Sequence, residues 1–170
     1  MEADPPLTLD HFSIFGSIIH SFAYHEHLIQ ATIAGIAKID IGNVIILTAP
    51  RGYAQKRDCL YSLMEHQIGN ENLKKQIKDY LDEIDKLNYL RNAIAHNMWV
   101  NGTRPNSIKP MGISVRGGKG KLKGVLESEP DYLLEELISL ADKLALINNS
   151  FLEFISTLGL LLNMDVKSNV

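Results

Sequence analysis

Apolar residues recur at helical spacing over most of the chain, and this pattern predicts four to five helices. The first series runs from about Leu9 to Ala37, with Asp10 as a candidate N-cap. The stretch 40–67 is ambiguous, because its β-branched cluster Val44-Ile45-Ile46 favours a strand. Pro50-Arg51-Gly52 interrupts this stretch, and we interpret the whole as a broken second helix.

The third helix has the clearest period. Gly69-Asn70 predicts a stop, and Asn70 or Asn72 can cap the helix that follows. The next apolar positions step by threes and fours, as in a helix packed against other helices: Leu73, Ile77, Tyr80, Ile84, Leu87, Ile94 and Met98. Arg91 falls in the middle of this stripe, whereas Asn92 and His96 share another face, one turn apart.

Pro130-Asp131 predicts the start of a long final helix. Its inward positions form one apolar series: Leu133, Leu134, Leu137, Leu140, Leu144, Ile147, Phe151, Phe154, Ile155, Leu158 and Leu161. The chain after these positions, residues 165–170, is predicted to be a flexible tail.

A different pattern lies between the third and the final helix. Residues 101–106 form a predicted loop, and residues 108–126 alternate around Arg116-Gly117-Gly118-Lys119-Gly120, which predicts a β-hairpin insertion. Segment 101–124 has no acidic residue, and its basic residues are Arg104, Lys109, Arg116, Lys119, Lys121 and Lys123. Such a hairpin can follow a phosphate backbone, and Trp99 before it can stack a base. Equally, lysines can protect an edge strand, and Trp99 can pack in the core.

Composition fits one globular domain. The chain has 170 residues, 45% of them hydrophobic and 22% charged, which is enough to bury a core without staples. We therefore expect a single domain over 1–170, of the all-α class: an antiparallel bundle with a small β-hairpin at about 108–126, inside the basic insertion 101–126. The net charge of −3 gives no global attraction to nucleic acid, so only the local charge of the insertion supports RNA binding.

Other features exclude several classes of protein. No apolar run approaches the roughly 20 residues that cross a bilayer, and no signal pattern is present, so we expect a cytoplasmic protein without membrane contact. The single cysteine, Cys59, fits a reducing compartment. The sequence has no dinucleotide-binding or phosphate-loop motif, so we expect no cofactor. His20, Tyr24 and His27, with His25 between them, lack metal-ligand spacing, so we interpret them as a polar stripe and expect no metal.

The segment Tyr89–Trp99 contains Arg91-Asn92-Ala93-Ile94-Ala95-His96 and resembles the signature of the HEPN superfamily. In that signature an arginine, usually followed by a polar residue, precedes a histidine with four to six residues between them; here four intervene. The position of the motif late in the third helix, before a long helix, is also similar.

The resemblance implies a metal-independent endoribonuclease that cleaves RNA by attack of the 2′-hydroxyl on the adjacent phosphate. His96 would shuttle a proton, Arg91 would stabilise the charge on the phosphate, and Asn92 would orient the imidazole or bind the phosphate. The resemblance also implies a homodimer, a toxin–antitoxin, antiviral or stress-response setting, and an antitoxin or nucleotidyltransferase as a further partner.

Helical geometry raises an objection to this hypothesis. Side chains five residues apart leave a straight helix about 140° apart. Arg91 and His96 therefore converge only if the helix ends or bends before His96, or if two subunits pool their residues. Two alternatives stay open: a non-catalytic HEPN-like module that binds RNA, nucleotide or a partner protein, and a structural dimer in which Arg91 is buried against Glu65, Asp58 or Glu135.

Overall fold

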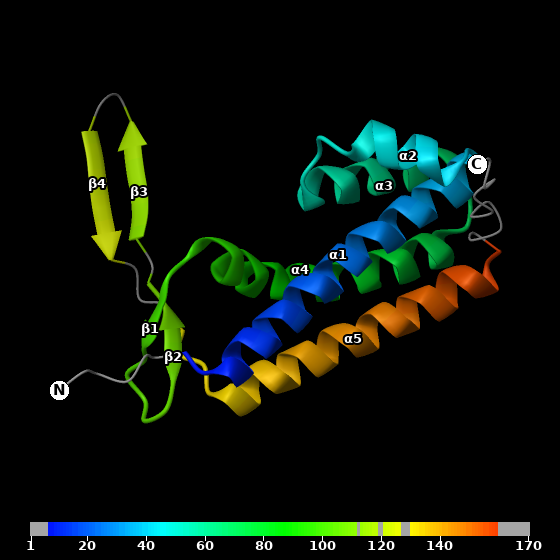
Figure 1. Ribbon diagram of the computed structural model, residues 1–170. Helices are drawn as coiled ribbons and strands as arrows, with labels where there is room; N and C mark the ends of the chain where they lie inside the picture. The colour runs from blue at the N-terminus through cyan, green and yellow to red at the C-terminus, as the bar shows by residue number, and fades with distance from the viewer. Residues whose placement is uncertain (1–6, 112, 119–120, 127–129, 160–170) are drawn as a thin grey trace, which may run out of the picture. The chain divides into compact units, whose positions relative to one another are not determined.

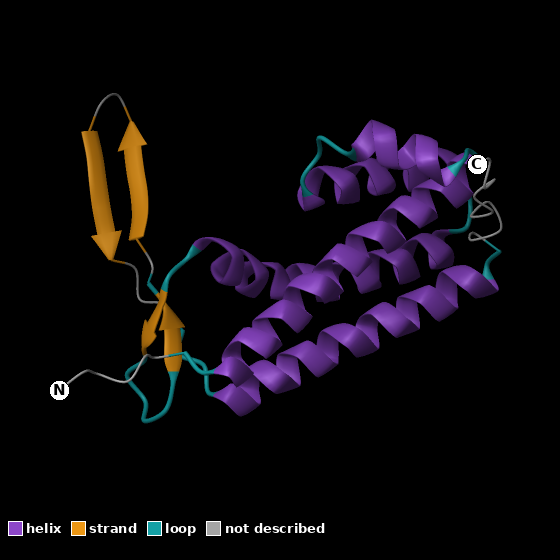
Figure 2. Cartoon of the chain, in the orientation of Figure 1, coloured by secondary structure: helices purple, strands orange, loops and turns teal. Residues whose placement is uncertain are grey.

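The computed structural model describes residues 7–111, 113–118, 121–126 and 130–159. Within them the chain is mainly helical, with five helices and two pairs of antiparallel strands (Figure 1). Figure 2 shows the strands following one another between the last two helices. This confirms the prediction of an all-α fold with a small β-hairpin. None of the described helices is long and apolar enough to cross a membrane.

The elements follow one another in this order: α1 (Leu9–Ala37), α2 (Ile41–Thr48), α3 (Tyr53–Gln67), α4 (Glu71–His96), β1 (Trp99–Asn101), β2 (Ile108–Pro110), β3 (Ile113–Gly118), β4 (Lys121–Leu126) and α5 (Leu134–Thr157). They belong to two compact units. The first comprises Met1–His20 and Leu87–Lys143, and the second comprises Ser21–Lys86 and Leu144–Val170. The single domain over 1–170 stays a prediction, and each unit is described by itself.

Short polar side chains set where the helices begin. Thr8, not Asp10, caps α1: its hydroxyl accepts from the His11 N–H at 3.5 Å, while Asp10 already lies inside the helix. Asp40 caps α2 by accepting from the Gly42 N–H at 2.8 Å, and this resolves the ambiguous stretch as helix rather than strand. Asn70, not Asn72, caps α4, since its Oδ1 accepts from two N–H groups of the first turn.

The strands differ in part from the prediction. The hairpin itself is β3 and β4, paired from Ile113 with Leu126 to Gly118 with Lys121. Residues 108–110 do not belong to it, because β2 pairs instead with β1, a strand that the sequence did not predict. Helix α5 begins at Leu134, later than predicted, because Tyr132 first exchanges two backbone hydrogen bonds with Ile108, at 2.8 and 2.9 Å.

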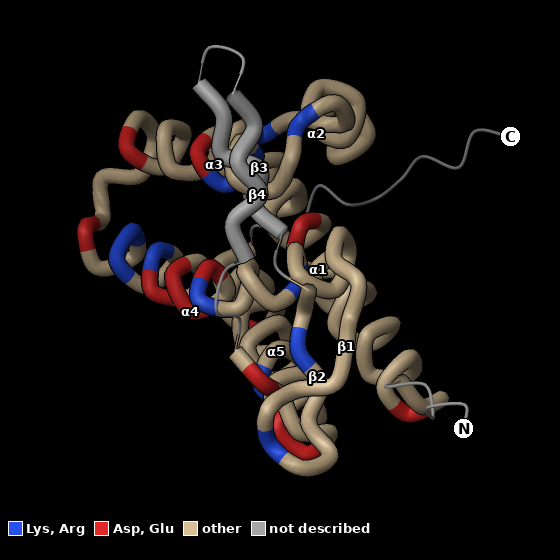
Figure 3. The backbone as a smooth tube through the Cα atoms, turned by 90° about the vertical axis from the view of Figure 1, so that its left-hand side faces the viewer, with Lys and Arg blue, Asp and Glu red and all other residues tan. Residues whose placement is uncertain are grey.

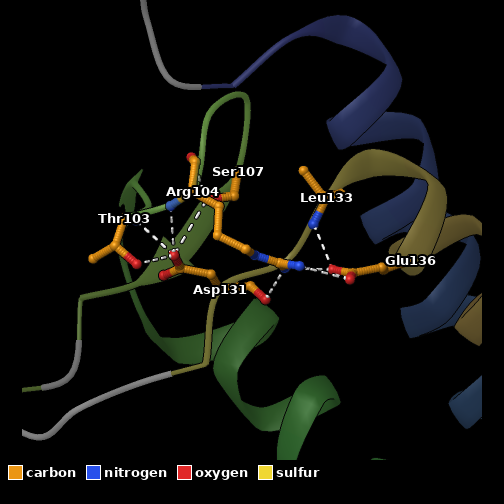
Figure 4. Close-up of polar contacts among 6 residues, drawn as sticks. All are labelled: Thr103, Arg104, Ser107, Asp131, Leu133 and Glu136. Carbon is orange, nitrogen blue, oxygen red and sulfur yellow. Dashed lines mark hydrogen bonds and ion pairs between the residues drawn. The ribbon is translucent and has the colours of Figure 1, made fainter.

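A carboxylate closes the loop between β1 and β2 (Figure 4). Asp131 Oδ2 accepts from the Thr103 N–H and hydroxyl, both at 2.5 Å, and from the Arg104 N–H at 3.0 Å. Hydrogen bonds from Thr103 hold the pKa of the Asp131 carboxyl down at about 2, so it stays ionised at neutral pH. Gly102 is required here, because a Cβ at this position would lie 2.1 Å from Ser107 Oγ. The loop and the segment before α5 are therefore fixed to each other.

The core of the second unit contains a polar contact between two helices. His25 and Asn148 are almost fully buried, and His25 Nδ1 lies 3.0 Å from Asn148 Oδ1. The Asn148 amide donates to the Ser21 carbonyl at 2.8 Å, so its oxygen faces His25 and the Nδ1 of that ring is the donor. Burial lowers the pKa of His25 to about 4, and the ring is therefore neutral at pH 7.

We expect acid to destabilise the protein through His25. In the unfolded chain His25 becomes protonated below its ordinary pKa of 6.5, whereas in the folded chain it stays neutral down to about pH 4. The free energy of unfolding therefore falls as the pH falls from about 6.5 to about 4. Between pH 7 and pH 4.5 the loss is about 2 kcal/mol in the free energy of unfolding. Asp85 and Glu26, the nearby carboxylates, oppose the shift only in part.

Urea denaturation of the wild type and of His25→Gln across this pH range measures the effect. Glutamine can still donate to Asn148 but does not titrate, so this variant should lose the pH-dependent component. His66→Gln, at an exposed position, is the matched control and should behave as the wild type. Equal pH profiles for the wild type and His25→Gln would show that His25 is not held neutral.

Candidate functional site

The motif predicted from the sequence occupies the last turn and a half of α4. Leu90 and Ala93 point into the core, Arg91 is half-buried, and Asn92 and His96 are exposed. The prediction that Arg91 lies in the middle of the apolar stripe is wrong. The buried positions step by threes from Ile84 to Ala93, which turns the stripe away from Arg91 and leaves it at the border.

Two of the three motif side chains are joined. Arg91 Nη1 donates a hydrogen bond of 2.8 Å to Asn92 Oδ1. Asn92 and His96 are four residues apart, so their side chains leave the same face of the helix. The hydrogen bond thus links the Arg91 guanidinium to a residue on the helix face of His96, although the Cα–Cβ bond of Arg91 leaves the helix elsewhere.

The backbone of α4 is regular up to the motif histidine. The helix continues to His96, and the Asn97 N–H still donates to the Ala93 carbonyl at 3.0 Å. The helix therefore does not end before His96. Any convergence within one copy of the chain depends on the length of the arginine side chain.

Two carboxylates proposed as partners of Arg91 have other partners in the structure. Glu65 accepts from Lys74 at 3.0 Å and from Lys78 at 2.6 Å. Asp58 accepts from Arg57 at 2.9 Å, and the third candidate, Glu135, is exposed. Arg91 itself is half-buried rather than enclosed in the core, and an ion pair at this position stays a prediction.

The last turn of α4 therefore presents three chemical groups. Arg91 carries a permanent positive charge with several N–H donors. Asn92 turns its oxygen to Arg91, which leaves its NH₂ group as the end that can donate to an anion. His96 presents an imidazole to solvent. Together they can bind a phosphate and move a proton.

Trp99 does not offer its ring to a base in this structure. Only 6% of its surface is exposed, and it packs between Phe15 and Tyr132, with ring centroids at 4.7 and 5.9 Å. Of the two interpretations open for this residue, packing in the core is the one observed. Trp99 is the first residue of β1, and its buried indole anchors the chain directly after the motif.

The Arg104 side chain is hydrogen-bonded within the protein. Its guanidinium donates to both carboxylate oxygens of Glu136, at 2.9 and 2.6 Å, and to the Asp131 carbonyl at 2.6 Å (Figure 4). The hydrogen bonds from Arg104 lower the pKa of Glu136 to about 2, which keeps the pair charged at neutral pH. Binding RNA through Arg104 would break this paired geometry, so we do not retain it as a binding residue.

The remaining basic residues of the insertion are distributed over two strand pairs. Lys109 is half-buried in β2. Arg116 and Lys123 are register partners of β3 and β4, and Lys121 begins β4. Lys119 lies outside the described residues. By contrast, α4 carries charges of both signs (Figure 3): Lys74, Lys75 and Lys78 are followed by Asp79, Asp82, Glu83 and Asp85.

Sequence reasoning missed the role of His25. The stretch with His20, Tyr24 and His27 was interpreted as one polar stripe, but His25 belongs to the core and bonds to Asn148. The signal was present in α5, where Asn148 interrupts the buried series between Leu144 and Phe151. No group of three or more potential metal ligands occurs in the part of the chain that the structure describes.

Comparison of the chain with models of protein families, with curated proteins and with solved structures gives no match. Membership of the HEPN superfamily stays a prediction from the motif.

We expect Trp99 to report on its own burial, because it is the only tryptophan of the chain. Its emission should be blue-shifted, weakly quenched by iodide and unchanged when RNA is added, since no base can reach the ring. Trp99→Ala should lower the free energy of unfolding by about 3 kcal/mol because it leaves a cavity beside Phe15. Strong quenching by iodide, or by RNA, would contradict this assignment.

Proposed function

We propose that the protein is an endoribonuclease of the HEPN type that cleaves RNA without a metal ion. The observation that carries this proposal is the hydrogen bond from Arg91 to Asn92, which links the guanidinium to a residue on the helix face of the exposed His96. A charged donor, an amide donor and a titratable base are the groups that phosphoryl transfer within RNA needs.

The reaction needs no group beyond these residues and the RNA. The ribose 2′-hydroxyl gives up its proton, its oxygen bonds to the adjacent phosphorus, and the bond from phosphorus to the 5′-oxygen breaks. The leaving 5′-oxygen takes a proton, which leaves a cyclic phosphate on one fragment and a 5′-hydroxyl on the other. His96 is the group that exchanges protons, since histidine is the side chain that most often transfers protons in catalysis. Arg91 and the Asn92 amide stabilise the charge on the phosphorane oxygens.

Substrate binding is assigned to the β3–β4 hairpin, supported by its charge. Arg116, Lys119, Lys121 and Lys123 lie within eight positions of one another, with no acidic residue among them. Contacts of this type bind the backbone irrespective of sequence and weaken with salt. The proposed setting is cytoplasmic, as a toxin or defence component, with a homodimer as the working form and an antitoxin or nucleotidyltransferase as a regulating partner.

One observation favours a second candidate, a HEPN-like module that binds RNA, nucleotide or a partner protein without cleaving. Because α4 continues as a helix to His96, the Cα–Cβ bonds of Arg91 and His96 leave it on different sides. In this geometry Arg91 and Asn92 can hold a phosphate while the His96 imidazole lies too far from the ribose to act on it.

We expect cleavage of a mixed RNA pool in EDTA by the wild type. Arg91→Ala and His96→Ala should each slow cleavage by about a hundredfold or more, because each removes charge stabilisation or proton transfer. Asn92→Ala should have a smaller effect of the same sign. His66→Ala, an exposed histidine at the end of α3, is the matched control and should leave the rate unchanged.

The product ends test the mechanism. If the 2′-hydroxyl attacks, the products must end in a cyclic phosphate or a 3′-phosphate. A single-stranded nucleic acid with 2′-deoxyribose at every position should bind but stay intact. An absence of cleavage across varied RNAs, by a folded wild type that still binds them, would establish the binding module instead.

A further inference from the structure

One large aromatic side chain of the first unit is exposed beside the motif. Tyr89 belongs to α4 and is 48% exposed, whereas its neighbours Leu87 and Leu90 are buried, at 8% and 4% exposure. A single exposed ring is common on protein surfaces, so its exposure alone says little. The position of Tyr89 relative to the motif side chains decides what the ring can do.

Tyr89 shares a helix face with the two exposed side chains of the motif. Asn92 follows it by three residues and His96 by seven, and α4 is helical over the whole stretch. Asn92 and His96 therefore leave the helix only about 60° and about 20° away from Tyr89. Along the helix axis Tyr89 lies about 4.5 Å from Asn92 and about 10 Å from His96. The three residues form a row, with Tyr89 at one end and Asn92 between it and His96.

A base-stacking surface needs an exposed aromatic ring next to a group that binds the backbone. Of the Phe, Tyr and Trp side chains that the structure describes in the first unit, only Phe12 and Tyr89 are exposed. Phe12 lines a groove together with Ile94, which leaves α4 about 140° away from Tyr89. Tyr89 is therefore the exposed ring that shares the face of the motif.

We propose that Tyr89 is the surface on which the substrate stacks a base, beside the phosphate that Arg91 and Asn92 bind. The inference rests on the proposed function for the binding of that phosphate. The Asn92 NH₂ group is the end of this side chain that can donate to an anion, and it lies about one turn from Tyr89. A base is joined to its phosphate through a single sugar, which spans this short step. Every base has a π-face, so the contact is tolerant of sequence.

Stacking on Tyr89 contributes to substrate binding and not to the chemical step. The base stays on the ring while the phosphate reacts, so the contact stabilises the bound substrate and the transition state equally. Loss of the ring should therefore raise KM and leave kcat nearly unchanged. His96→Ala should instead lower kcat, because it removes proton transfer.

Binding of a single-stranded oligodeoxynucleotide, which is not cleaved, tests the stacking. Tyr89→Ala should raise the dissociation constant about tenfold, which is within the range expected for one stacked base. Tyr89→Phe should bind as the wild type because it keeps a ring, whereas Tyr89→Leu should resemble Tyr89→Ala. Phe12→Ala removes another exposed ring of the same unit and is the matched control, with unchanged binding.

An oligonucleotide of abasic sites separates stacking from any other role of Tyr89. The wild type should bind it at least tenfold more weakly than the oligonucleotide with bases, and Tyr89→Ala should add no further loss, because the stacked base is already absent. If Tyr89→Ala weakened the binding of both ligands equally, the ring would serve the fold or the backbone, and the proposal would be overturned. Unchanged binding of the normal oligonucleotide by Tyr89→Ala would also overturn it.

Tyr89→Trp reports on the stacked base directly. Trp99 is buried, so a decrease in emission that the oligodeoxynucleotide causes in this variant but not in the wild type belongs to position 89. Emission that the ligand leaves unchanged would contradict the stacking.

These results are independent of cleavage. A wild type that passes the binding tests but never cleaves RNA would overturn the proposed nuclease and keep the stacking surface. Cleavage by Tyr89→Ala with the KM of the wild type would keep the nuclease and overturn the stacking.

Discussion

The regular backbone that α4 keeps through His96 is the constraint on which the candidate site depends. It fixes the directions in which Arg91, Asn92 and His96 leave the helix, and it places the first on a different side from the other two. The hydrogen bond from Arg91 to Asn92 links the two sides. The candidate site is therefore formed by the last turns of α4 and by the side-chain conformation of Arg91, and not by a loop that closes over a substrate.

The elements after α4 hold that turn in place. Trp99 anchors the start of β1 between two aromatic rings, and the pairing of β2 with Tyr132 leads into α5. Asp131 and Arg104 then close the intervening loop through charged hydrogen bonds. Within this unit, Arg104 and Trp99 make contacts that hold the fold, and most of the other basic residues of the insertion belong to the β3–β4 hairpin.

The helices could be predicted from the sequence because a helical period and a Gly or Pro stop are local signals. The bounds predicted for α1 agree with the structure, and so does the interruption at Pro50. Features that depend on distant partners could not be predicted in the same way. The late start of α5 follows from the pairing of Tyr132 with Ile108, and the burial of His25 follows from its bond to Asn148. For the site, the sequence gives residue types and spacing, but the reach of Arg91 toward Asn92 depends on a rotamer that no period encodes.

The most direct measurement of the site is an NMR titration of the protein with an RNA analogue that lacks 2′-hydroxyls and is not cleaved. If Arg91, Asn92 and His96 act as one site, the Asn92 side-chain amide and the His96 ring resonances shift together at the same ligand concentration, and Arg91→Ala abolishes both shifts. Binding of the analogue with neither resonance moving would contradict the account, because it would place the nucleic acid elsewhere on the protein.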